Sequence, residues 1–92
     1  MNHLHTVNSS EHLSDCLRFL KGGDALLLIE DGVYCLTNTA LNNLPSSVAV
    51  YALLDDTNAR GLSQQAENHS KIISYNEFVQ LCCDHQRIIN WF

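Results

Sequence analysis

The chain has 92 residues, of which 46% are apolar, and its formal net charge is −5 at pH 7. A chain of this length can bury one hydrophobic core and leaves no room for a second, so we expect a single domain over residues 1–92. The five basic side chains are scattered along the sequence, which argues against direct nucleic-acid binding, because a phosphate backbone requires clustered positive charge.

The sequence also indicates the cellular compartment in which the protein is expected. No apolar run approaches the roughly 18 to 20 residues of a membrane span, and the start MNHLHTVN lacks the basic region and the long apolar core of a secretory signal. We therefore expect a cytoplasmic protein that makes no membrane contact. Its four cysteines should then be thiols, because structural disulfides are rare in reducing compartments.

The first elements in chain order are a strand and a helix. Leu4–Val7 is predicted to be a short strand. The segment SSEHLSDCLRFLKGG follows, and apolar residues recur in it at helical spacing, at Leu13, Cys16, Leu17 and Leu20. We expect Asn8 or Ser9 to cap this helix and the pair Gly22-Gly23 to end it.

The middle of the chain carries two further strands. Ala25–Ile29 is apolar on both faces, which is typical of a parallel strand covered by helices on each side. From Asp31 to Leu44 we predict one or two short helical turns, closed by Pro45. Val48–Leu53 is rich in β-branched and aromatic residues and is predicted to be the third strand.

A polar segment follows the third strand. The sequence DDTNARG predicts a short helix that Asp55 or Asp56 starts and Gly61 stops. The stretch LSQQAENHS after it is predicted to be a polar loop. Lys71–Ile73 is predicted to be a short fourth strand.

The chain then returns to a helix and a final apolar segment. Ser74 and Glu77 have the spacing of a capping box, which opens a helix with Phe78, Val79 and Cys82 on one side. The segment RIINWF is predicted to be a last edge strand or a docked terminus. Strands that alternate with such helices imply an α/β fold, with a mostly parallel four- to five-stranded sheet between two helical layers.

In an open parallel sheet, ligands bind outside the carboxyl ends of the strands. This chain offers acids there, in Glu30-Asp31-Gly32 and in Asp55-Asp56, and no glycine-rich turn with a basic residue. Carboxylates repel phosphate, so a nucleotide site is excluded. Each aspartate precedes a predicted helix start, and we interpret Asp31, Asp55 and Asp56 as exposed helix caps.

A cysteine that acts as a nucleophile requires a thiolate and access to its partner. Cys16 lies on the apolar stripe of the first helix, where packing is the usual role. Cys35 gains from a helix amino terminus, but Glu30 and Asp31 oppose thiolate formation just upstream. We interpret Cys35 and Cys82 as packing residues and Cys83 as more exposed.

The histidines form no complete metal site in the sequence. His3 and His5 share one face of the first strand, an arrangement that ligates a metal or merely decorates a strand end. Without a third ligand we interpret them as decoration. The adjacent pair Cys82-Cys83 lacks zinc-site spacing, so no metal and no cofactor is predicted.

Four segments together resemble one family. The opening LHTVNSS, the motif LLLIEDGVY, the segment VYALLDDTNARGL and the closing YNEFVQL…INWF are similar to the TusB/DsrH family of sulfur-relay proteins, over the whole chain. The resemblance implies a DsrE-like α/β fold. It also implies a heterohexamer with TusC/DsrF-like and TusD/DsrE-like subunits, supplied with persulfide sulfur by a TusA-like donor and passing it to a downstream acceptor protein.

The resemblance further implies a role in 2-thiolation of the wobble uridine of transfer RNA. In the TusD/DsrE-like subunit the working cysteine precedes a helix that ends in Arg-Gly, and the comparable segment here, 53–61, contains no cysteine. We therefore expect a structural subunit of a sulfurtransferase complex, not catalytic by itself. The alternative is a DsrH-type subunit of sulfur oxidation with Cys16 as a persulfide carrier. A third interpretation is a binding domain whose acidic rim takes a cation or a basic protein.

Overall fold

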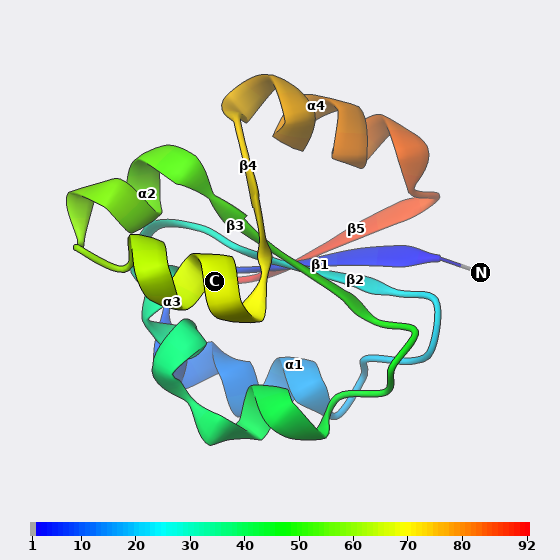
Figure 1. The fold of residues 1–92 in the computed structure, drawn as a ribbon. Coiled ribbons are helices and arrows are strands. Elements are labelled where there is room, and N and C mark those ends of the chain that lie inside the picture. The colour runs from blue at the N-terminus through cyan, green and yellow to red at the C-terminus, as the bar shows by residue number, and fades with distance from the viewer. Residues whose placement is uncertain (1) are drawn as a thin grey trace.

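The computed structural model describes residues 2–92 as one open sheet with helices on both faces (Figure 1). The sheet has five strands, all parallel, in the order β4-β3-β2-β1-β5. Its strands are β1 (His3–Val7), β2 (Ala25–Leu28), β3 (Ala49–Leu53), β4 (Lys71–Ile73) and β5 (Arg87–Trp91). The predicted α/β class, the parallel sheet and its helical layers are confirmed.

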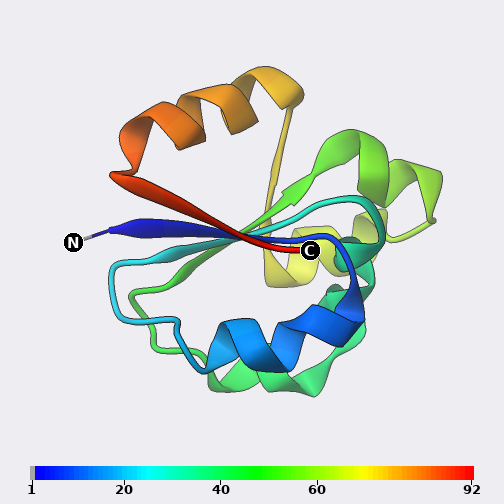
Figure 2. The ribbon, with the colours of Figure 1, turned by 180° about the vertical axis from the view of Figure 1, so that it is seen from behind.

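The central strand β2 explains the fold most directly. All four of its residues are buried, because helical layers cover both sides of the sheet. Strand β1 pairs with β2 on one side and with β5 on the other, so the last strand of the chain lies beside the first (Figure 2). The closing apolar segment is therefore an edge strand, as predicted.

Two apolar clusters fill the space between the sheet and its helices. The larger one lies under α1 (Leu13–Leu17), the 3-10 segments and α3 (Ser63–His69). The smaller one lies under α4 (Tyr75–Asp84), which stands on the opposite face (Figure 1). Helix α2 (Leu54–Ala59) continues directly from β3 at the carboxyl end of the sheet. No helix among residues 2–92 is long and apolar enough to cross a membrane.

Several connections between the strands are wound more tightly than α-helices. Three segments form 3-10 helices, namely η1 (Ser10–His12), η2 (Glu30–Thr37) and η3 (Thr39–Asn43). Ser9 caps η1 through its side chain, as predicted. The first α-helix ends at Leu17, before the glycine pair, because the next backbone N–H, that of Arg18, already bonds back to Asp15 in a tighter turn.

One local prediction is wrong in each of α3, α2 and α4. The stretch predicted as a polar loop contains α3, because Leu62 and Ala66 are spaced one turn apart and both reach the core. Asp55 and Asp56 lie inside the first turn of α2 and do not cap it. In α4 the packed stripe is Phe78, Leu81 and Cys82, while Val79 points to solvent and is 53% exposed. The capping box of Ser74 and Glu77 is confirmed.

Candidate functional site

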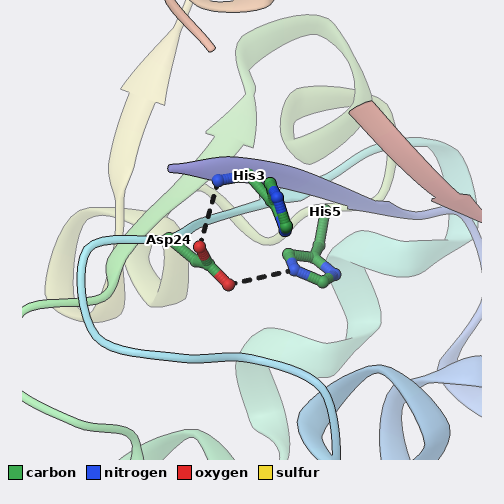
Figure 3. A group of neighbouring side chains, drawn as sticks. All are labelled: His3, His5 and Asp24. Atoms are coloured by element: carbon green, nitrogen blue, oxygen red, sulfur yellow. Dashed lines mark hydrogen bonds and ion pairs between the residues drawn. The ribbon is translucent and has the colours of Figure 1, made fainter. Parts of the chain in front are cut away.

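A cluster of polar side chains lies at the amino ends of the strands, opposite the edge where ligands were expected. His3 and His5 alternate with Leu4 along β1, so both rings face the α1 side of the sheet. Asp24 immediately precedes β2, whose first residue Ala25 pairs with Leu4. This register brings the carboxylate of Asp24 beside both histidines (Figure 3). Asp24 is thus the third polar member that the sequence did not indicate.

Asp24 is buried and is held by three donors. The backbone N–H groups of His3 and Lys21 donate to its two carboxylate oxygens, each over 3.0 Å. The Nε2 atom of His5 lies 3.2 Å from its Oδ2 atom. Burial alone would raise the pKa of Asp24, but these hydrogen bonds stabilise the carboxylate and hold the pKa below its usual value. The buried group therefore carries a negative charge.

The tautomer of His5 is fixed by the C-terminal strand. The indole Nε1–H of Trp91 donates to Nδ1 of His5 over 3.0 Å. An indole can only donate, so Nδ1 is an acceptor and the proton of the neutral ring is on Nε2, where it donates to Asp24. Burial lowers the pKa of His5 more than the hydrogen bond and the charge of Asp24 raise it. Both observations describe a neutral imidazole.

The cluster borders an open cavity of about 390 Å³, lined by His3, His5, Phe19, Lys21, Asp24 and Ile89. The ring of Phe19 covers Trp91 on one side, with ring centres 5.5 Å apart. Phe19 is nevertheless 58% exposed. The cavity therefore combines an apolar wall with the polar edge of the histidine cluster.

The two core cysteines are unsuited to nucleophilic chemistry in this conformation. Cys16 and Cys35 are both 0% exposed and lie in the same apolar cluster. Burial raises the pKa of Cys16 to about 12 and that of Cys35 to about 11. The interpretation of Cys35 as a packing residue is confirmed. Cys82 is half-buried and Cys83 is exposed.

At the carboxyl edge the acids are engaged in local contacts. Arg60 donates from Nε to Asp31 over 2.9 Å and has a second ion pair with Asp56. Asp56 also accepts the backbone N–H of Glu30 over 2.7 Å, and Glu30 has a left-handed φ of 49°. The 3-10 segment η2 begins after Ile29 with no side-chain cap, so the prediction that Asp31 is a cap is wrong. The acidic side chains at this edge therefore take part in a local network of ion pairs and hydrogen bonds.

Trp91 and Asp24 are the site residues that sequence reasoning missed. Their bonds to His5 span 86 and 19 positions, and only the strand order brings these residues together. One local signal pointed to Asp24, since an aspartate directly before a fully apolar strand is next to a buried position. The order of the strands, which brings Asp24 and Trp91 to His5, has no such local signal.

The parallel sheet with its C-terminal edge strand and buried core thiols defines a small parallel α/β protein. Known proteins similar to this chain support that class. The chain is similar to the solution NMR structure of protein Tm0979 from Thermotoga maritima, with a TM-score of 0.59, 34% identity and coverage of 89% of this chain and 92% of that one. It is 42% identical to Protein TusB of Pectobacterium atrosepticum and 40% identical to Protein TusB of Escherichia coli K12, covering 96% of this chain and 99% of each relative. The profile of the family described as DsrH like protein matches residues 5–88.

The chain belongs to the DsrH-like family. The resemblance inferred from the four sequence segments is thereby confirmed.

Proposed function

We propose that this chain is a cytoplasmic, structural subunit of a sulfur-relay complex that passes persulfide sulfur towards 2-thiolation of the wobble uridine in transfer RNA. The observation that carries this proposal is the absence of an available thiol where a carrier needs one. Segment 53–61, which forms the end of β3, helix α2 and the turn after it, contains no cysteine. Membership of the DsrH-like family supports the same role.

The core thiols support a structural role for a physical reason. A persulfide carrier must present a thiolate to its donor, and burial in apolar surroundings disfavours the charged sulfur. Cys16 is 0% exposed and its pKa is raised to about 12, so the core would have to open before it could react. The alternative role of Cys16 as a carrier in sulfur oxidation therefore requires a conformational change.

Exposed apolar side chains on the surface support a subunit that binds other chains. Large apolar side chains between 40% and 61% exposed are Phe19, Tyr34, Leu54, Tyr75, Val79, Ile88 and Phe92. Helix α4 has no fully buried residue, although it packs over the smaller apolar cluster on its face of the sheet (Figure 1). Such apolar surface fits contacts with other chains. We propose TusC/DsrF-like and TusD/DsrE-like subunits as these partners, in a heterohexamer that meets a TusA-like donor.

The test is co-expression of this chain with its two related subunits, followed by native mass spectrometry and intact-mass measurement of each subunit. We expect one assembly of all three chains, with the mass of added sulfur on a partner only. A chain that stays monomeric contradicts the proposal.

The alternative is tested with four single cysteine-to-serine variants in the same assembly. We expect sulfur transfer to be unchanged in all four, because the partner carries the sulfur. Added sulfur on this chain, lost in the Cys16→Ser variant, would instead establish the carrier role. The Cys83→Ser variant is the matched control, since Cys83 is exposed and lies outside the core.

A further inference from the structure

We propose that His3, His5 and Asp24 form a binding site for a zinc ion, with Nε2 of His5, Oδ2 of Asp24 and one ring nitrogen of His3 as ligands. One donor atom from each residue lies within 4.8 Å of the other two. Two imidazole nitrogens and a carboxylate oxygen are a ligand set that zinc accepts, with water in the remaining position. Figure 3 shows the three side chains around a common space.

The distance between the two buried ligands already suits a metal ion. Nε2 of His5 and Oδ2 of Asp24 are 3.2 Å apart. In a tetrahedral zinc site with bonds of about 2.0 Å, two ligand atoms are about 3.3 Å apart. Zinc would therefore take the place of the proton between these atoms with almost no change in their separation. His3 is half-buried at the first position of β1, and one of its ring nitrogens lies within 4.8 Å of the other two ligand atoms, so His3 would have to move closer to complete the site.

The surroundings supply the rest of the site. The cavity of about 390 Å³ borders all three ligands and has room for a bound water. The backbone N–H groups of His3 and Lys21 hold the Asp24 carboxylate from behind, as outer partners hold metal ligands elsewhere. Lys21 also lines the cavity, and because Lys21 is exposed its ammonium group can remain in solvent.

Zinc binding has a consequence for Trp91. When zinc occupies Nε2 of His5, the ring proton moves to Nδ1 and the ring stays neutral, with no change of oxidation state. Nδ1–H then faces the indole N–H of Trp91, and two donors cannot bond each other. The hydrogen bond breaks and the indole turns away. Trp91 is the single tryptophan of the sequence, so its fluorescence reports this step.

The experiment titrates the full chain with zinc, using calorimetry and Trp91 fluorescence. The background carries Cys82→Ser and Cys83→Ser, so that the thiols of α4 do not bind the ion. We expect equimolar binding with a dissociation constant in the micromolar range and a change of Trp91 fluorescence. His3→Ala should weaken binding at least tenfold, because it removes one ligand and keeps the backbone N–H that Asp24 accepts. The exposed His69→Ala variant is the matched control and should bind as the background does.

A second variant tests the coupling to Trp91. Trp91→Phe removes the hydrogen bond that zinc must break, so calorimetry should show binding about two- to tenfold tighter than in the background. The proposal is overturned if no equimolar binding occurs, or if His3→Ala binds zinc as tightly as His69→Ala does. Trp91→Phe binding no tighter than the background would overturn the proposed proton shift on His5.

Discussion

Replacing Asp24 with asparagine should destabilise the protein far more than its small change in shape suggests. The carboxylate accepts from His3, Lys21 and His5, and it is 2% exposed. An amide offers one acceptor oxygen, so at least one of the three donors loses its partner wherever the amide points. An orphaned buried donor costs about 1 to 3 kcal/mol, and the lost charge assistance brings the expected total to about 2 to 5 kcal/mol. That is a large part of the roughly 5 to 15 kcal/mol that stabilises a small domain.

The assay is urea unfolding followed by circular dichroism and Trp91 fluorescence. Asp15→Asn is the matched control, because Asp15 is exposed and its carboxylate forms a surface ion pair with Arg18. The control should change the free energy of unfolding by no more than about 0.5 kcal/mol. Equal midpoints for Asp24→Asn and Asp15→Asn would refute the reasoning.

A double variant, followed by circular dichroism alone, tests why the cost arises. Trp91→Phe by itself should cost about 1 kcal/mol, since it removes one hydrogen bond. Without the indole donor, the proton of His5 can move to Nδ1, and Nε2 can then accept from the amide introduced at position 24. The loss in the double variant Asp24→Asn with Trp91→Phe should therefore be less than the sum of the single losses. If the two losses of free energy simply added, this would contradict the assignment in which Trp91 donates to Nδ1 of His5 and Nε2–H of His5 donates to Asp24.

Three further results are expected. Gly32→Ala should lower the free energy of unfolding by more than about 2 kcal/mol in urea titrations, because its Cβ would collide with the carbonyl oxygen of Val7. The raised pKa values of Cys16 and Cys35 keep both thiols protonated in the folded chain above pH 9, where the unfolded chain loses these protons. Stability should therefore fall by about 1.4 kcal/mol per thiol and pH unit from pH 9 up to each folded pKa, about 12 for Cys16 and about 11 for Cys35. In urea titrations at these pH values, replacing either cysteine with alanine should make this slope shallower. Ser74→Ala should cost about 1 kcal/mol in thermal unfolding, because it removes the capping box of α4.

The sequence was sufficient for the parts of the fold that local patterns determine. The apolar run of β2 and the capping box of α4 both identify their elements without reference to the rest of the chain. Helix α3 was missed because its surface is polar and only Leu62 and Ala66 reach the core, too few for a clear helical period. The sheet itself followed from the alternation of strands and helices, which is a property of the whole sequence.

The candidate site could not be found in the same way. His3 and His5 were recognised as neighbours because a strand repeats every two residues. Asp24 joins them only through the register of β1 against β2, and Trp91 only because β5 returns to the far side of β1. Sequence spacing carries no information about either pairing.

The position of β1 in the sheet has a consequence for biosynthesis. Strand β1 comes before the other four strands of the sheet in the chain, yet one of its two neighbours, β5, comes after all of them. A growing chain therefore exposes β1 as an unpaired edge until residues 87–91 have left the ribosome, and an unpaired edge invites aggregation. Chains that terminate early should accumulate as insoluble or rapidly degraded fragments, even when they contain every other element of the fold.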